Sequence, residues 1–209
     1  MPAKAPVIRM VQFNGYHGCS YCFEIDIHHN HRMLYPVNTV SRLRTIRDFH
    51  SYGRKAQRKK KMIFGFRGFS PLNNIFAFPW DAPVDAMHQI FLGTAKVLVK
   101  GFINRLRSED ARKLDEMIQL AKVPSEFLHK PKSLAEINYW KAADFKLFFF
   151  HLGPLLLRKL TSVKHQYYES FCTLVLAVRL LSERVVNCDA LDAADDLISR
   201  FYTNFDVVW

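Results

Sequence analysis

Residues 84–102 read VDAMHQIFLGTAKVLVKGF, and their spacing of apolar residues is the clearest indication of the fold class. Its apolar residues recur every three to four positions, at Val84, Met87, Ile90, Phe91, Ala95, Leu98 and Phe102. This spacing predicts a long amphipathic helix that begins near Pro83 and turns one apolar face toward a core. The sequence therefore favours a mainly α fold.

The rest of the C-terminal part carries further helical patterns. We expect a second helix from about Ser108 to Lys122, with Ser108 as its N-cap and two acids in its first turn. A third helix opens at Ser133 and carries an aromatic stripe before Gly153-Pro154 stops it. Two more helices are expected over residues 162–186 and 190–205. The last 125 residues are thus predicted to be almost entirely helical, as a bundle.

The N-terminal part lacks this period. Val7 to Phe13 is a short β-branched run that ends at Asn14-Gly15, which is typical of a strand entering a turn. A loop with one short helix over Val40 to His50 should follow, because helix-breaking residues come next, at Gly53, Gly65, Gly68 and Pro71. The expected segments are a strand plus zinc-knuckle segment at 1–35, a basic loop region at 36–79 and a helical domain at 80–209.

Composition excludes several classes of protein. A hydrophobic share of 49% with 14% aromatic residues is too apolar for a disordered chain. The apolar runs fall short of the roughly 20 residues that a membrane span needs, so we expect no membrane partner. There is neither a glycine-rich phosphate loop nor a serine nucleophile elbow, which leaves NTPase and hydrolase chemistry without support.

The net charge of +11 is concentrated in one segment. From Arg32 to Arg67 there are eleven Lys and Arg residues against one acid, Asp48, so this stretch alone carries +10. Such a segment favours a polyanionic partner, DNA or RNA phosphate. For residues 54–61 alone, a nuclear-import signal or a solvated loop is an equal alternative. The residues expected to contact nucleic acid are Arg42, Arg44, Arg47, Arg54, Lys55, Arg58, Lys59, Lys60, Lys61 and Arg67.

Cys19 and Cys22 form a C-x2-C pair on a glycine-containing turn. Two thiolates at this spacing can face one tetrahedral Zn²⁺ ion, but they are only half of a site. The other two ligands could be His28 and His31, or they could come from elsewhere in the fold. Two thiols without a metal are the alternative. The remaining cysteines, Cys172 and Cys188, are expected to be small buried apolar side chains.

A second pair is Asp85 and His88, three residues apart and therefore on one helical face. The carboxylate could hold or orient a hard cation such as Mg²⁺. By itself this spacing is a weak signal, since an aspartate N-cap beside a half-buried histidine is the commoner arrangement. Taken alone, the segment Trp140 to Phe145, with Asp144, is typical of a helix that has one face in the core and the other in solvent.

In order and spacing, several segments together resemble the CACTA (En/Spm-like) transposases and cover nearly the whole chain. They are residues 13–22, Tyr35-Pro36, residues 65–72, residues 84–98 and Trp140-Lys141-Ala142-Ala143-Asp144-Phe145. The C-x2-C and the downstream D-x2-H are shared hallmarks of that group.

This resemblance implies the helical insertion of an RNase H-like nuclease, whose acidic DDE triad holds two divalent metals for DNA cleavage and strand transfer in cut-and-paste transposition. Cys19 and Cys22 match the zinc pair, and Asp85 and His88 match the D-x2-H, which has a supporting role near the active site. A nuclear location, a DNA partner and a homo-oligomer are compatible with the resemblance.

The chain departs from the family at both ends. The second catalytic aspartate of the family precedes a segment like Pro2-Ala3, and its histidine pair and catalytic glutamate follow a helix like residues 190–209. We therefore expect an internal fragment without the triad, in which Mg²⁺ would belong only to an intact family member. Asp144 stands where many relatives carry glutamate.

Two other functions remain open at this point. One is a helical binding or interaction module with a local zinc knuckle and no nuclease ancestry. The other is a small complete enzyme that uses Asp85, His88 and Asp144, which would require acids from distant helices to meet.

Overall fold

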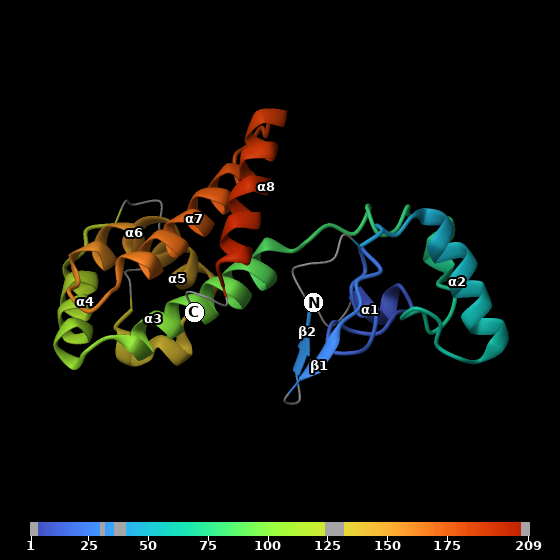
Figure 1. The fold of residues 1–209 in the computed structure, drawn as a ribbon, viewed down its shortest axis with the longest axis horizontal. Coiled ribbons are helices and arrows are strands. Elements are labelled where there is room, and N and C mark those ends of the chain that lie inside the picture. The colour runs from blue at the N-terminus through green and yellow to red at the C-terminus, as the bar shows by residue number, and fades with distance from the viewer. Residues whose placement is uncertain (1–3, 30–31, 36–40, 124–131, 206–209) are drawn as a thin grey trace. The chain divides into compact units, whose positions relative to one another are not determined.

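The computed structural model describes residues 4–29, 32–35, 41–123 and 132–205. The chain divides into two compact units, unit 1 at residues 1–85 and unit 2 at residues 86–209 (Figure 1). The protein is mainly helical, as predicted, and the described residues contain a single two-stranded sheet. None of the helices described is long and apolar enough to cross a bilayer.

Unit 1 contains few regular elements. These are α1 (Lys4–Val7), β1 (Ile27–His29), β2 (Arg32–Leu34), α2 (Ile46–Lys59) and the 3-10 turn η1 (Pro71–Asn74). The strands β1 and β2 form an antiparallel hairpin in which His28 lies opposite Met33. The core of the unit is small and consists of Ile8, Met10, Phe49, Ala56, Phe66 and Phe78.

The strand expected over Val7 to Phe13 is absent, which corrects that prediction. Helix α1 ends at Val7, and Arg9 has a positive φ of 56° that bends the chain. Only Met10 forms an isolated bridge, with Phe66. Ile8 and Met10 of this run enter the core from a bent segment, whereas Val7 and Phe13 are exposed, so β-branching alone gave the wrong prediction.

Helix α2 differs from the short helix expected over residues 40–50. Val40 lies outside the described residues, and the helix begins at Ile46 after the N-cap Thr45. It continues through Gly53 to Lys59 and ends on Lys60, whose φ is 49°. Gly53 is tolerated because it packs against the backbone of the next segment: a Cβ atom there would lie 3.1 Å from the Gly68 carbonyl oxygen. Tertiary packing thus offsets the roughly 1 kcal/mol helix penalty of glycine.

Unit 2 is a bundle of short helical segments. Their order is η2 (Met87–Ala95, a π-helix), α3 (Lys96–Arg105), α4 (Ser108–Leu120), η3 (Leu134–Tyr139, 3-10), α5 (Ala142–Leu147), η4 (Phe148–Leu152, π), α6 (Gly153–Leu156), η5 (Leu157–Lys159, 3-10), α7 (His165–Leu181) and α8 (Cys188–Thr203). Its core is rich in phenylalanine, including Phe102, Phe145, Phe148, Phe149 and Phe171. In Figure 1, α7 and α8 run side by side as a helical hairpin.

Three details of unit 2 differ from the sequence predictions. Arg107, not Ser108, is the N-cap of α4, and it makes no side-chain cap hydrogen bond. The expected third helix is interrupted between Tyr139 and Ala142. Cys188 is exposed at the start of α8, whereas Cys172 is partly buried. Cys188 is the first residue of α8. At a helix N-terminus the apolar spacing that predicts burial has not yet begun, so a small side chain can be exposed there.

Gly153-Pro154 does not stop the helix as predicted. Proline lacks the N–H that would bond the carbonyl of Phe150, four residues earlier. In the structure Arg179 Nη2 of α7 donates to that carbonyl oxygen over 2.9 Å. Gly153 also leaves room for the ring of Phe171, since a Cβ atom would lie 2.8 Å from its Cζ. Contacts with α7 therefore replace the missing local bond.

Candidate functional site

The two cysteines of the C-x2-C turn face each other. Cys19 Sγ and Cys22 Sγ lie 3.3 Å apart, and both residues are partly exposed. A zinc ion bound by two sulfurs at about 2.3 Å in tetrahedral geometry requires a sulfur separation of roughly 3.8 Å. The turn is thus close to the geometry of half a zinc site, and soft thiolates are the donors that zinc prefers.

The cysteine turn is poorly suited to hold a free thiolate. Burial, with a further contribution from the neighbouring Cys19, outweighs a backbone hydrogen bond at Glu24 and raises the pKa of the Cys22 thiol to about 11. At neutral pH the Cys22 sulfur therefore stays protonated unless a cation stabilises its thiolate.

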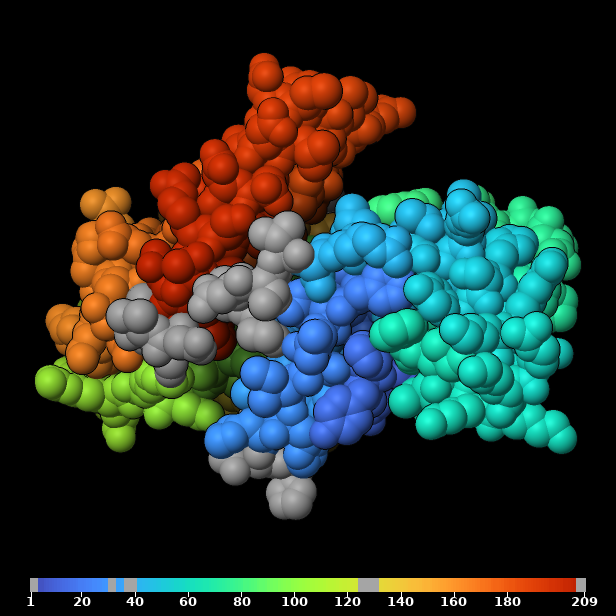
Figure 2. Space-filling model, turned by 45° about the vertical axis from the view of Figure 1, so that its right-hand side comes forward, coloured from blue at the N-terminus to red at the C-terminus, as the bar shows by residue number. Residues whose placement is uncertain are grey.

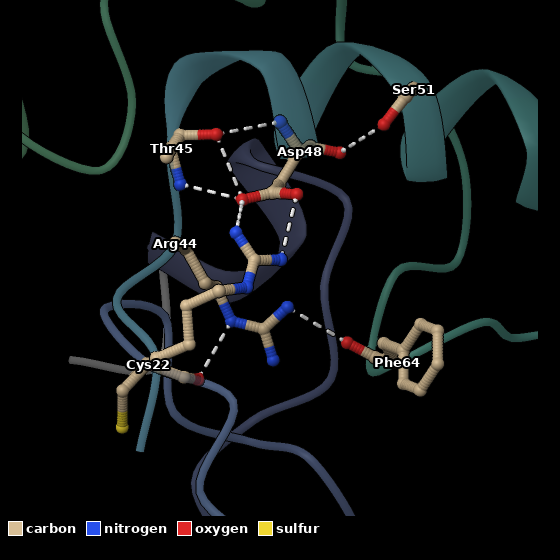
Figure 3. Close-up of polar contacts among 7 residues, drawn as sticks. Cys22, Arg44, Thr45, Asp48, Ser51 and Phe64 are labelled. Carbon is tan, nitrogen blue, oxygen red and sulfur yellow. Dashed lines mark hydrogen bonds and ion pairs between the residues drawn. The ribbon is translucent and has the colours of Figure 1, made fainter. Parts of the chain in front are cut away.

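Arg44 holds this turn in place from behind. Its side chain is fully buried, and its Nε donates to the carbonyl oxygens of Cys19 at 3.0 Å and Cys22 at 2.9 Å. The Nη atoms donate to the carbonyl oxygens of Phe64 and His17, at 3.0 and 3.3 Å. Figure 3 shows the guanidinium between the cysteine turn and the segment that follows α2, with the Cys22 sulfur directed away from it.

The position of Arg44 corrects one expected nucleic-acid contact. A guanidinium that is buried and bonded to four carbonyl groups cannot reach a phosphate in this structure. It is a structural residue, and the ring of Phe23 lies against it with the centroid 4.1 Å away. Charge density in the sequence could not reveal this, because the four carbonyl oxygens come from residues 17 to 64.

Arg42 is partly engaged in the same region. Its guanidinium pairs with both carboxylate oxygens of Asp48 at 3.0 Å, and Asp48 also accepts from the backbone N–H of Thr45 at 2.8 Å (Figure 3). Burial alone would raise the pKa of Asp48, but the hydrogen bonds from Arg42 and Thr45 outweigh it and lower that pKa. The Asp48 charge is thereby neutralised at the start of α2.

The remaining predicted contacts are all exposed. They are Arg47, Arg54, Lys55, Arg58, Lys59, Lys60, Lys61 and Arg67. We call Arg47, Arg54 and Arg58 the arginine stripe: they lie seven and four residues apart along α2, on one face, opposite the buried Phe49 and Ala56. The cyan surface at the right of Figure 2 belongs to α2 and the residues that follow it.

Acidic side chains offset little of this charge at the surface of unit 1, where Asp81 is exposed and Asp85 is partly exposed. Glu24, Asp26 and Asp48 are buried, with Asp26 accepting the backbone N–H of His17 and Asp48 paired with Arg42. Among the described residues, neither Arg47 nor Arg58 takes part in an ion pair. The exposed face of α2 therefore carries only positive charge.

The other expected metal ligands are not gathered with the cysteines. His28 lies on the exposed strand β1, and His31 lies outside the described residues. In the described ranges no three His, Cys, Asp or Glu side chains are close enough to share a metal ion. The described residues thus supply two of the four ligands that a zinc site needs, namely Cys19 and Cys22.

Asp85 and His88 fall on either side of the division between the two units. Asp85 is the last residue of unit 1, and His88 is exposed in the first turn of η2, whose N-cap is Ala86. Asp144, in contrast, has a structural role: it accepts the Lys141 N–H at 2.7 Å at the start of α5 and pairs with Lys132 at 3.3 Å. An enzyme that uses Asp144 as a free carboxylate is therefore not supported.

Sequence reasoning missed one hollow in unit 2. A groove of about 530 Å³ lies between α7 and α8. It is lined by apolar and polar side chains, among them Tyr168, Glu169, Leu176, Arg200 and Phe201. The helical period predicted both helices, but their side-by-side packing was needed to reveal the space between them.

No protein-family model, curated protein or solved structure matches this chain. Its function must therefore be argued from the exposed basic helix and the cysteine turn.

Proposed function

We propose that unit 1 binds the phosphate backbone of nucleic acid through the exposed basic face of α2. The observation that carries this proposal is the arginine stripe, which lies opposite the core on a helix whose one acidic residue, Asp48, is buried. Guanidinium groups suit phosphate oxygens because their planar donors can bind two oxygens at once. Backbone contacts of this kind carry no base sequence information.

The dimensions of α2 fit such a role. Arg47 and Arg58 are eleven residues apart, so they are separated by about 16 Å along the helix axis at 1.5 Å per residue. Duplex DNA carries one negative charge per about 1.7 Å of its axis, so several phosphates fall within that span. The lysines at the end of the helix, Lys59, Lys60 and Lys61, extend the positive surface further.

The proposed ancestry is that of a CACTA-type DDE transposase, with unit 2 as a helical insertion of the RNase H-like kind. The order of the C-x2-C, the D-x2-H and the Trp140 segment supports it. This ancestry makes DNA in the nucleus the expected ligand. The activity that we propose for this chain is binding, because Asp144 is used to cap α5 and the cysteines supply half a metal site.

Binding is tested by its dependence on salt. A labelled 20-base-pair duplex is titrated with the protein at several salt concentrations and followed by fluorescence anisotropy. The triple variant Arg47→Gln, Arg54→Gln, Arg58→Gln should flatten the slope of log K against log salt by roughly 2.7, since each phosphate contact contributes about 0.9.

A control with the same loss of charge comes from unit 2. Arg107, Arg112 and Arg184 are exposed there, and their change to glutamine should leave the slope nearly unaltered. Equal effects of the two triple variants would show that net charge alone drives binding. No change in the first variant would remove α2 as the binding surface.

A further inference from the structure

The cysteine turn is an open half of a tetrahedral site. Cys19 Sγ and Cys22 Sγ converge to 3.3 Å, and both residues are partly exposed. Within the described ranges no third His, Cys, Asp or Glu joins them. A zinc ion that bound here would have two coordination positions left to fill.

Exposed apolar side chains occur around the same turn. Phe13 and Tyr16 precede Cys19 by six and three residues and are 66% and 56% exposed. Ile25 follows Cys22 by three residues and is 70% exposed. Leu43, which pairs with the backbone of Cys22, is 56% exposed. Apolar residues gathered at a surface mark sites of protein association.

We propose that one zinc ion joins two copies of this chain, with Cys19 and Cys22 of each copy supplying its four thiolate ligands. The four thiols release their protons to solvent as they bind, and the centre carries a net charge of −2. A second copy is the occupant that supplies both missing sulfurs and a matching apolar surface in one symmetric contact.

The charges of unit 1 favour this centre. Arg44 sits behind the turn and donates to the carbonyl oxygens of both cysteines, so a fixed positive charge offsets the anionic cluster. Because Arg44 binds the two carbonyls together, the sulfur pair is held in place before the metal arrives. A preformed pair reduces the entropy lost on coordination.

The test uses the full 209-residue chain under a thiol-free reductant, with Zn²⁺ as the only added ligand. Light scattering after size-exclusion chromatography should show the mass doubling from 24.4 kDa, with saturation at one zinc per two chains. Substitution by Co²⁺ should give the intense charge-transfer absorption of four thiolates. The variant Cys19→Ser with Cys22→Ser should lose both signals, whereas Cys172→Ser with Cys188→Ser should keep them.

The wild-type stoichiometry keeps the proposal testable even if the double serine variant fails to fold. A second variant, Ile25→Glu with Leu43→Glu, places like charges across the contact and should weaken the dimer at least tenfold. One zinc per monomer, lost on changing His31, would overturn the proposal in favour of a local site. A dimer of the same mass that forms in the same reductant without zinc would overturn it as well. Salt-dependent DNA binding is measured separately, so failure of either proposal leaves the other intact.

Discussion

Arg44 Nε donates a hydrogen bond to the carbonyl oxygen of Cys22 over 2.9 Å, although the two residues are separated by more than twenty positions in the chain. The same nitrogen also binds Cys19. The Arg44 side chain therefore links the segment just before α2 to the cysteine turn. The sequence predicted that Arg44 contacts phosphate, but its guanidinium instead binds backbone carbonyl groups and holds them in place.

Replacing Arg44 should strongly destabilise unit 1. Arg44→Met keeps the aliphatic length but leaves four carbonyl groups without their donor, and each buried unsatisfied group costs about 1–3 kcal/mol. We expect the free energy of unfolding to fall by at least about 3 kcal/mol in urea denaturation. Arg47→Met, on the exposed face of α2, serves as the control and should change stability by less than about 0.5 kcal/mol. Similar losses in both variants would contradict the structural role of Arg44.

Asp48 should make the stability of unit 1 depend on pH in the acid range. Its folded pKa lies below the ordinary 3.8, so the carboxylate stabilises the fold above the unfolded pKa, and this contribution is lost as pH falls through the folded pKa. Asp48→Asn should therefore cost about 1–2 kcal/mol near pH 7. The difference between wild type and variant should shrink steadily below about pH 4. Thermal unfolding measured from pH 2 to 7 checks this, and a difference independent of pH would disprove it.

Gly153→Ala should destabilise unit 2 although alanine favours helices. Alanine in a helix gains roughly 1 kcal/mol over glycine. The new methyl group, however, would lie 2.8 Å from Phe171 Cζ, and overpacking of a core typically costs about 1–3 kcal/mol. A double-mutant cycle with Phe171→Leu provides the check, because the smaller side chain should make Gly153→Ala less harmful. Additive effects would mean that the two residues do not compete for space.

Arg179→Met should leave the Phe150 carbonyl oxygen without its donor and lower the stability of unit 2 by about 1–2 kcal/mol. Pro154→Ala in the same chain should suppress this loss, because the restored N–H of residue 154 can bond that carbonyl locally. Calorimetric melting of the two single variants and the double variant tests the compensation. The idea fails if the double variant melts below both single variants.

The helical elements could be predicted because their apolar residues follow a strong period. Most of residues 84–102 form a continuous helical stretch, which begins at Met87 as η2 and continues as α3, and α7 and α8 lie where patterns indicated helices. Two of the errors occurred at Gly53 and at Gly153-Pro154, which local propensity treats as stops. In both places the chain continues as a helix because a neighbouring segment packs against the glycine or bonds the freed carbonyl. Such contacts are set by residues far away in sequence.

The candidate site was partly predictable for the same reason. The C-x2-C spacing places two sulfurs together by local geometry alone, and the structure confirms their proximity. The arginine stripe was not predicted, because the expected helix ended at His50 and left Arg54 and Arg58 in a loop, whereas α2 continues to Lys59. The burial of Arg44 could not be foreseen, because arginine is seldom buried and its partners come from two distant places in the chain, residues 17–22 and Phe64.

The hydrogen bonds that Arg44 donates also constrain the order in which unit 1 can fold during synthesis. During synthesis the cysteine turn leaves the ribosome before Arg44, and Phe64 emerges later still. Until Arg44 emerges, the carbonyl oxygens of His17, Cys19 and Cys22 lack the donor that they have in the folded unit and must stay hydrated, and the set of four acceptors is complete only after Phe64. Unit 1 therefore cannot mature from its N-terminus onward, and a nascent chain arrested before residue 64 should expose the cysteine turn to proteases and thiol reagents.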